Sequence, residues 1–290
     1  MSGFLPDATN PPQLARRFGG CQYRAAPMPP FVDIHCHMLP AVDDGAGDMA
    51  TALAMAEMAV ADGVGTVVVT PHQLGAFGHN RGDDIRRRTS ELQRALATAR
   101  IPLTVLPGGD VRVEDDLPGR LATGDALTLA DRGRHVLLEL PHELYLPLDG
   151  VLASLRRRAI VGILSHPERN AGLLAQPQLI AELVDAGCLM QVTAGSLAGA
   201  FGPPSQQLAE WMLGQGLVHF LASDAHGVRS RRPLLGRAFE RAAELVDEAT
   251  AADLCCHWPA RVAAGGDVPA GRRGIPRRGW RRMFSRTKAA

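Results

Sequence analysis

From residue 31 onward, short apolar runs alternate with longer stretches rich in alanine, leucine, glutamate and arginine. The apolar runs cover residues 31–34, 65–70, 103–106, 135–140, 161–165, 189–192 and 218–222. Most are β-branched or otherwise apolar at nearly every position, which is typical of strands buried on both faces. The stretches between them cover 49–62, 83–99, 148–158, 178–186, 205–215 and 234–247. We predict these stretches to be helices. Such alternation predicts an α/β fold with a parallel sheet, and about seven strands favour a closed or nearly closed barrel over an open sheet.

Polar residues gather at the carboxyl ends of the predicted strands. They are Asp33, His35, His37, Thr70, His72, Asp110, Glu139, Ser165, His166, Ser223, Asp224 and His226. In a parallel barrel the carboxyl ends of all strands share one rim, and active sites form at that rim. Histidines scattered through a core would show no preference for one end of each strand, so this pattern indicates a functional site.

Two pairs of these residues have the spacing of metal ligands. In an extended strand, residues i and i+2 point to the same side, so His35 and His37 can reach one cation while Cys36 points away. Asp224 and His226 repeat that spacing after the last predicted strand. Either pair alone is also compatible with structural side chains at a strand end, and it is their combination with the other strand ends that favours a metal site.

The complete set of candidate ligands contains five imidazoles and four carboxylates. It consists of His35, His37, Asp44, His72, Asp110, Glu139, His166, Asp224 and His226. Nitrogen and oxygen donors without thiolate suit zinc, manganese or iron. So many ligands exceed the needs of one ion, and two or three ions with shared ligands would use them. Three divalent ions and four carboxylates leave a charge of +2 (6 − 4), which complements a phosphoryl dianion. This predicts phosphoester hydrolysis by water that the metal ions activate.

Two arginine features are consistent with a phosphate substrate. Arg169 lies three residues after His166, and Arg231 and Arg232 follow His226 by a short loop. Guanidinium groups bind phosphate oxygens as a planar fork, although exposed loop arginines are a common alternative. The chain lacks the Gly-x-Ser-x-Gly elbow, the Cys-x5-Arg phosphate loop and the Gly-x4-Gly-Lys-[Ser/Thr] nucleotide loop. Nucleotide-loop chemistry is therefore disfavoured.

Composition narrows the remaining function classes. The chain is 46% hydrophobic and 21% charged, which supports a real core. A net charge of +1 and only 4% aromatic residues give no indication of nucleic acid binding. Five scattered cysteines favour reduced thiols in a cytosolic protein over a disulfide scaffold. No apolar run approaches the length of a membrane span, and the start of the sequence has no signal-peptide layout.

The two ends of the chain differ in composition from the predicted barrel. We expect a poorly ordered leader over residues 1–30, a phosphatase barrel over 31–265 and a basic tail over 266–290. After Gly271 the tail carries eight positive charges and no acidic residue. A solvated tail and a weak contact with an anionic membrane or an acidic partner are both compatible with this composition. The sequence gives no indication of the oligomeric state.

Five ordered motifs resemble the PHP (polymerase and histidinol phosphatase) superfamily. They read VDIHCHMLPAVDDG at 32–45, TPH at 70–72, LLELP at 137–141, LSHPERN at 164–170 and ASDAH at 222–226. Within the superfamily they are most similar to the bacterial metal-dependent tyrosine phosphatases of capsule and exopolysaccharide operons. The resemblance extends from about residue 31 to residue 245. It implies a distorted (β/α)7 barrel, similar to a TIM barrel.

The resemblance also implies a trinuclear site and a role for each candidate residue. His35, His37 and Asp224 would hold the first ion, Glu139 and His166 the second, and Asp44, His72 and His226 the third. Asp110 would bridge, and Arg169 and Arg231 would bind the substrate phosphate. The metal would be manganese, or alternatively iron or zinc. The substrate would be a phosphotyrosine-bearing protein, namely a membrane-associated tyrosine autokinase that controls polysaccharide export, so the enzyme would be cytoplasmic and close to the membrane.

Three positions depart from the family pattern. Asp110 stands where family members usually have Glu, Gln73 where they usually have His, and Gly227 where they often have Asn. The first could change bridging or metal preference. Two other functions stay open at this point: a phosphoesterase for a small metabolite such as histidinol phosphate, and a weakly active metal-binding protein that docks a polysaccharide-assembly kinase.

Overall fold

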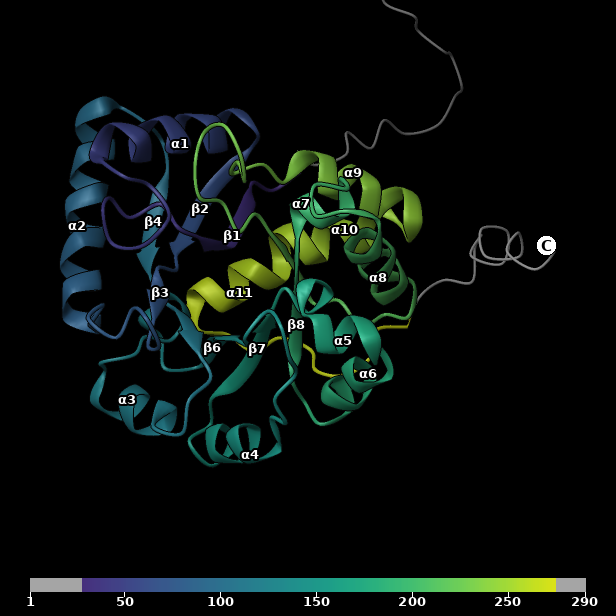
Figure 1. Cartoon of the computed structure of the whole chain (residues 1–290). Coiled ribbons are helices and arrows are strands. Elements are labelled where there is room, and N and C mark those ends of the chain that lie inside the picture. The colour runs from purple at the N-terminus through teal and green to yellow at the C-terminus, as the bar shows by residue number, and fades with distance from the viewer. Residues whose placement is uncertain (1–27, 275–290) are drawn as a thin grey trace, which may run out of the picture.

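Parallel strands form the centre of the fold, in two sheets surrounded by helices (Figure 1). The structure is a computed structural model that describes residues 28–274. The first sheet has the order β1 (Phe31–Cys36), β2 (Val64–Val69), β4 (Thr104–Pro107). The second has the order β3 (His72–Gln73), β5 (Asp110–Arg112), β6 (His135–Glu139), β7 (Val161–Ser165), β8 (Leu189–Thr193), β9 (Phe220–Ala222). Every pairing is parallel, as predicted.

The two sheets are close to each other at both edges. On one side β2 is separated from β3, and β4 from β5, by only two residues each, and the Asp110 amide donates to the Pro71 carbonyl oxygen at 3.1 Å. On the other side Cys36 and Ala225 form a parallel bridge, and the His37 amide donates to the Ala225 carbonyl oxygen at 2.8 Å. The seven predicted apolar runs all contain strands, but β3 and β5 were not predicted as separate elements.

Helices formed in all six stretches where the sequence predicted them. They are α1 (Met49–Ala61), α2 (Gly82–Ala99), α4 (Asp149–Arg157), α6 (Gln178–Asp185), α8 (Pro203–Gly214) and α9 (Gly236–Leu245). Local chemistry explains some boundaries: Asp48 caps α1 by accepting from the Thr51 amide at 2.7 Å. Asp83 and Asp84 in the first turn of α2 interact favourably with its dipole.

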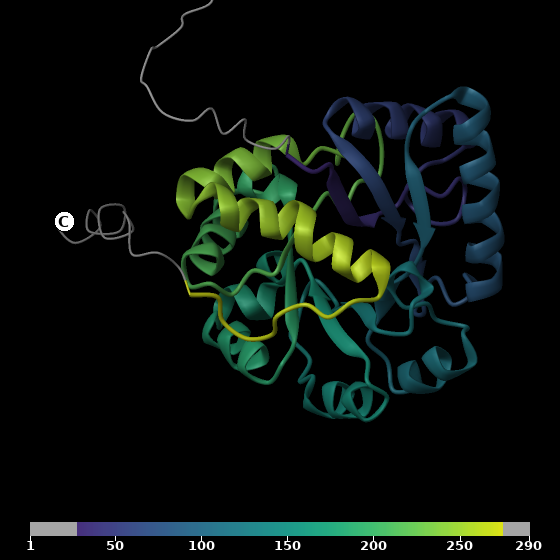
Figure 2. The same ribbon diagram turned by 180° about the vertical axis from the view of Figure 1, so that it is seen from behind.

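Shorter helices complete the fold. They are α3 (Leu117–Thr123), α5 (Ala171–Ala175), α7 (Ala194–Leu197), α10 (Glu248–Ala252) and α11 (Trp258–Ala264), with single turns at Leu129–Asp131 and Pro167–Arg169 and a π-helical turn at Asp253–His257. Figure 2 shows α11 crossing the back of the molecule, behind the strands. The opposite face therefore stays free for the strand ends that carry the predicted ligands.

The segment after α11 continues along the back of the molecule. The Arg273 amide donates to the Gly216 carbonyl oxygen at 2.8 Å, and the Arg273 guanidinium lies 4.7 Å from the centroid of the Trp258 ring. Residues 266–274 of the expected basic tail thus contact the rest of the described fold. The rest of that tail and nearly all of the expected leader lie outside the described residues, so the proposed membrane contact stays a prediction.

Two sequence expectations concern the class of protein. Within residues 28–274 we find no helix with the length and apolarity that a bilayer crossing requires. Cys36, Cys188, Cys255 and Cys256 are buried and free, as expected for reduced thiols, and Cys21 lies outside the described residues. Burial raises the pKa of all four of these thiols, so they are not reactive thiolates.

Candidate metal centre

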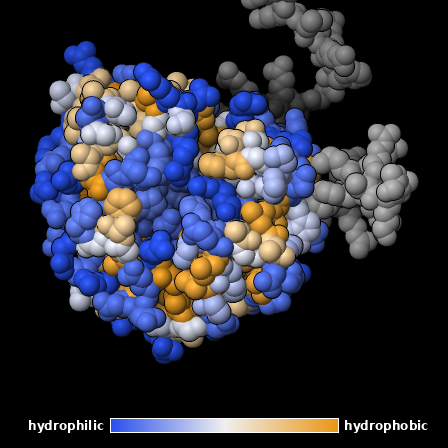
Figure 3. Space-filling view, in the orientation of Figure 1, coloured by the Kyte–Doolittle hydropathy of each residue, from blue (hydrophilic) through white to orange (hydrophobic). Residues whose placement is uncertain are grey.

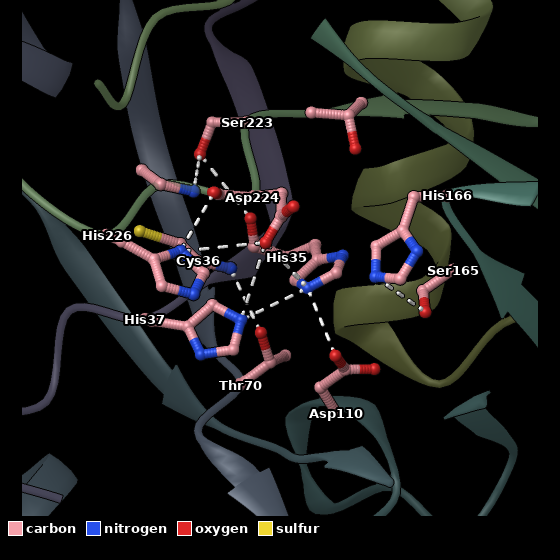
Figure 4. A network of polar contacts seen from close by, with 12 residues as sticks. His35, Cys36, His37, Thr70, Asp110, Ser165, His166, Ser223, Asp224 and His226 are labelled. Atoms are coloured by element: carbon pink, nitrogen blue, oxygen red, sulfur yellow. Dashed lines mark hydrogen bonds and ion pairs between the residues drawn. The ribbon is translucent and has the colours of Figure 1, made fainter. Parts of the chain in front are cut away.

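Three side chains from two neighbouring strand ends point at one another in the middle of the rim (Figure 4). His35 and His37 come from the end of β1, and Asp224 follows β9. The two histidine Nε2 atoms are 3.2 Å apart, and Asp224 Oδ1 lies 3.3 Å from Nε2 of His35 and 3.5 Å from Nε2 of His37. All three side chains are buried. These donors face a common point, as ligands of one ion do.

A second group of donors lies beside the first, where the rim opens to solvent. Asp44 Oδ1 is 3.5 Å from His72 Nε2 and 3.3 Å from His226 Nε2. Together with His37, these residues offer four donor atoms within 4.8 Å of one another. The carboxylate of Asp44 is 56% exposed, so this group is the most accessible part of the centre.

Asp110 lies between these two groups. Its Oδ2 is 3.5 Å from His35 Nε2 and also 3.5 Å from His72 Nδ1, and Glu139 Oε2 is 3.4 Å from the same His72 nitrogen. Gly109 makes this position possible, because a Cβ at residue 109 would lie 2.2 Å from Gln73 Oε1. The Asp110 carboxylate therefore lies within 3.5 Å of a donor nitrogen from each of the two groups.

The third group contains a histidine that the sequence analysis did not include. Glu139, His142 and His166 offer donor atoms within 4.8 Å of one another, and the rings of His142 and His166 are stacked with centroids 5.2 Å apart. His142 is exposed, on the loop after β6. One signal for it was available: Glu139 and His166 alone gave the second ion only two ligands.

A supporting layer fixes how two of the histidines face the centre. The Nδ1–H of His37 donates to Asp43 Oδ2 at 2.7 Å, and the Nδ1–H of His35 donates to Gln191 Oε1 at 2.8 Å. Both rings therefore present Nε2 to the centre, which is how metal-binding histidines are usually held. The turn that carries Asp43 requires glycine at residue 45, because a Cβ there would lie 2.1 Å from the His37 carbonyl oxygen.

The carboxylates of the centre stabilise positive charge on the groups that face them. Burial lowers the pKa of His37 to about 4, so this ligand is neutral at physiological pH. Burial also opposes protonation of His35, but Asp224 and Asp110 outweigh it and raise the pKa of His35 to about 9. In the same way Asp110 and Glu139 overcome burial and raise the pKa of His72 to about 11. Without another cation, the carboxylates hold protons on these two rings.

Unpaired polar atoms provide a direct test of whether metal ions fit. Buried atoms without a hydrogen-bond partner are found at His72 (Nδ1), Asp110 (both carboxylate oxygens), Asp224 (Oδ1) and His226 (Nε2). Such atoms are costly unless something binds them. These are five of the eleven such side-chain atoms within residues 28–274, and the other six are on residues outside the predicted ligand set. The five gather at one centre, and nitrogen and carboxylate oxygen atoms suit divalent transition metals. The residues present therefore fit a cluster of metal ions.

Arg169 and Arg231 lie at the edge of the centre, on the other side of Asp224. Nη1 of Arg169 and Nη2 of Arg231 both donate to Asp224 Oδ2, the latter at 2.7 Å, while Oδ1 of the same carboxylate faces His35 and His37. One carboxylate thus positions two guanidinium groups beside the candidate ions. In the space-filling view, hydrophilic residues gather in the middle of this face (Figure 3).

Gln73 is the departure from the family pattern that the structure explains most fully. Its Nε2 donates to the carbonyl oxygens of Asn80 and Asp125 at 2.8 and 2.9 Å, and its Oε1 accepts from the Leu127 amide at 2.8 Å. The side chain is buried and connects three backbone segments. Gln73 thus serves as a structural amide, and it belongs to none of the donor groups.

Comparisons with known proteins agree with this geometry. A family model described as "Capsular polysaccharide synthesis, CpsB/CapC" matches residues 31–264. The tyrosine-protein phosphatase YwqE of Bacillus subtilis is 37% identical over 203 residues, which cover 69% of this chain and 79% of YwqE. The putative tyrosine-protein phosphatase CapC of Staphylococcus aureus is 30% identical over 210 residues, which cover 72% of this chain and 82% of CapC.

A solved structure shares the whole fold. It comes from the crystal structures of YwqE from Bacillus subtilis and CpsB from Streptococcus pneumoniae, described as metal-dependent tyrosine phosphatases. The superposition has a TM-score of 0.80 at 31% sequence identity and covers 85% of this chain and 100% of the other.

Proposed function

The chain belongs to the CpsB/CapC family of capsular polysaccharide synthesis, and on this premise we propose that it is a metal-dependent protein-tyrosine phosphatase. The observation that carries the proposal is the convergence of nine predicted ligands and two arginines at one rim. Predicted ligands from six separate chain segments lie within a few ångströms of each other, and five of their buried atoms have no hydrogen-bond partner within residues 28–274, which supports bound cations.

We infer that the centre holds three ions, with manganese as the first choice and iron or zinc as alternatives. His35, His37 and Asp224 would hold one ion, and Asp44, His72 and His226 another. Glu139 and His166 would hold the third, and Asp110 would connect the groups. When bound, such ions act as Lewis acids on the phosphoryl group and lower the pKa of a coordinated water.

The arginines would bind the substrate phosphate. Their shared contact with Asp224 orients both guanidinium groups toward the centre, where their remaining N–H groups can donate to phosphoryl oxygens. Phe201 supports Arg169, whose guanidinium lies 4.2 Å from the ring centroid. Arg169 is only 11% exposed, so little side-chain entropy remains to be lost when it binds a ligand.

We further infer that the two sheets are parts of one distorted seven-stranded barrel. Two features support this interpretation: β2 leads into β3 and β4 into β5 across two residues, and the Cys36–Ala225 bridge connects the outer strands β1 and β9. The breaks at Thr70-Pro71 and Gly108-Gly109 turn the chain so that His72 and Asp110 reach the centre.

The substrate that we propose is phosphotyrosine on a membrane-associated tyrosine autokinase that controls capsule or exopolysaccharide synthesis. The names of the relatives support phosphotyrosine as the substrate, and the description of the family supports a role in capsule synthesis. The membrane-associated kinase is what the resemblance of the motifs implies. It would place the enzyme in the cytoplasm, close to the membrane that carries its substrate.

The test is hydrolysis by the full chain before and after metal removal. Protein loaded with Mn²⁺ should release phosphate from a phosphotyrosine peptide, lose this activity with a chelator and recover it with Mn²⁺. Asp224→Asn should abolish turnover, whereas His257→Ala, which changes an exposed histidine outside the donor groups, should not. Faster hydrolysis of histidinol phosphate or another small phosphomonoester than of the peptide would favour the metabolite phosphatase. Stoichiometric metal without turnover of any substrate would favour a docking protein.

A further inference from the structure

A pocket of about 400 Å³ lies beside the metal centre, and none of the predicted ligands lines it. The loop before α9, the start of α9 and the segment around α7 form its walls. Its rim carries four arginines, namely Arg229, Arg231, Arg232 and Arg237. Small apolar residues and two larger ones, Phe201 and Leu234, form the rest of the lining. The lining thus combines an apolar part, which we call the floor, with a cationic part, which we call the rim.

Of the four rim arginines, only Arg231 pairs with a carboxylate within residues 28–274, that of Asp224. The side chains of Arg229, Arg232 and Arg237 are exposed, and none of them lies within 4.0 Å of a carboxylate in that part of the chain. Nε of Arg231 is buried and has no hydrogen-bond partner there. By contrast, Arg241 on the next turn of α9 pairs with two glutamates.

Two acidic groups near the pocket have partners outside it. Asp62 accepts from the amides of Leu235 and Gly236 at the start of α9, and Glu244 pairs with Arg241. Glu240 lies one turn after Arg237 and shares a separate surface hollow with it. Arg229 and Arg232 are therefore the cations most available to a ligand.

The pocket is directly connected to the proposed phosphate site. Ser223 in its wall precedes Asp224, and Arg231 in its rim donates to Asp224 Oδ2 at 2.7 Å. Phe201 faces the pocket and also lies under the guanidinium of Arg169. Arg231 and Phe201 therefore each contact both the pocket and a residue of the proposed phosphate site.

The lining indicates what kind of group fits. A guanidinium rim binds anions, and phosphate more strongly than a single carboxylate because it offers more acceptor oxygens. An apolar floor with a phenylalanine favours an aromatic ring, whereas a short acidic side chain would leave that floor uncovered. An aromatic ring that carries a phosphate matches both features.

We propose that this pocket binds a second phosphotyrosine of the same substrate chain while the first is at the metal centre. The inference rests on the proposed phosphatase function and deepens it, because it assigns the pocket a binding role beside the metal centre. In an extended peptide, residues i and i+2 lie on the same side about 7 Å apart. We therefore expect a spacing of two residues to suit the adjacent sites.

The test uses peptides with one hydrolysable phosphotyrosine and a variable residue two positions away. That residue is tyrosine, glutamate or phosphonomethylphenylalanine, a phosphotyrosine mimic that cannot be hydrolysed. The Mn²⁺-loaded wild type is compared with an Arg229→Gln/Arg232→Gln variant. The matched control is Arg157→Gln/Arg158→Gln, which removes two exposed arginines where α4 ends, at the opposite end of the strands.

We expect the phosphonate peptide to have a KM about tenfold lower than the tyrosine peptide, as one or two charge-assisted contacts would give. The Arg229/Arg232 variant should lose this advantage, and the control should keep it. The advantage is the ratio of the two KM values within each protein, so a change in basal hydrolysis of p-nitrophenyl phosphate does not alter it. No advantage in the wild type, or an equal advantage in the variant, would overturn the proposal. If the glutamate peptide had a KM as low as that of the phosphonate peptide, the pocket would bind an acidic side chain in general, and its assignment to phosphotyrosine would be wrong.

A binding measurement separates this inference from the proposed function. A peptide with the phosphonate at both positions is titrated calorimetrically into the metal-loaded proteins, so that no turnover is needed. Weaker binding to the Arg229/Arg232 variant than to the control would support the pocket even if no phosphotyrosine peptide were hydrolysed. Equal binding to both would refute the pocket while leaving the metal centre untouched.

Discussion

Asp43 offers a sharp test of how the supporting layer controls the metal centre, because its carboxylate is not itself a predicted ligand. It accepts three hydrogen bonds, from His37 Nδ1 at 2.7 Å and from the amides of His72 and Gly45 at 3.0 Å each. In Asp43→Asn the single amide oxygen cannot replace two carboxylate oxygens, and the new N–H₂ group faces a donor. The orientation of the His37 ring is then no longer fixed.

The size of the effect follows from these contacts. Loss of a hydrogen-bonded partner behind a metal-binding histidine typically weakens metal affinity by about 10–100-fold, or about 1.4–2.7 kcal/mol. We expect the upper end of that range, because the Asp43 carboxylate is fully buried and contacts two ligand segments. Turnover at saturating Mn²⁺ should fall much less than affinity does.

The assay is calorimetric titration of Mn²⁺ into chelator-treated protein, with activity followed against free Mn²⁺. Asp48→Asn is the matched control, since it removes an exposed carboxylate that only caps α1 and asparagine caps a helix equally well. Equal Mn²⁺ affinity in Asp43→Asn and wild type would refute the assigned role of Asp43 in orienting His37.

Four further outcomes follow from the same structure. Removal of metal should lower the melting temperature as well as the activity, because Asp110 and Asp224 are then left without cations, and scanning fluorimetry with and without Mn²⁺ measures this. Arg169→Lys should reduce kcat/KM for phosphotyrosine peptides by about 10–100-fold, since lysine offers no planar fork, with metal content unchanged by elemental analysis. His142→Ala should weaken the binding of one ion in calorimetric titration, whereas an unchanged isotherm would show that Glu139 and His166 suffice. Burial lowers the pKa of His219 to about 4, below its unfolded value of about 6.5. Its contribution to stability, about 3 kcal/mol at most, is therefore present above pH 6.5 and lost as pH falls toward 4, so denaturant unfolding of His219→Gln should depend less on pH in that interval.

The longer strands and helices could be predicted from the sequence. Strands buried on both faces appear as continuous apolar runs, and helices appear as apolar residues at helical spacing. All six predicted helices form, and all seven apolar runs contain strands. The predicted ligand pairs could also be recognised in the sequence, because side chains two positions apart, such as His35 and His37, share a face of an extended strand. What the sequence did not reveal is the turn after β2 and β4, where two residues redirect the chain and start β3 and β5. These strands have only two and three residues, too few to show an alternating pattern of apolar and polar positions.

Other parts of the site depend on contacts between distant segments, which a single sequence does not record. Gln191 supports His35 from a strand 156 positions away, and its side chain resembles any other buried amide until the pairing is known. His142 is similar, since only the stacking against His166 distinguishes it from an ordinary loop histidine. The role of Gln73 became clear from its three backbone partners, not from the residue type.

The backbone at the rim gives a reason why these residues converge. His166, Asp224 and Arg231 have φ values of 35°, 50° and 47°, in the left-handed region where side chains other than glycine are strained. Each follows a strand end or closes a loop there, so the unusual turn directs a functional side chain back over the rim. Glycine would relieve the strain but would remove the donor atom. Strain of about 1–3 kcal/mol at each such residue must be offset by the surrounding fold. Bound cations would offset more of it, which couples the stability of the barrel to the metal content of its centre.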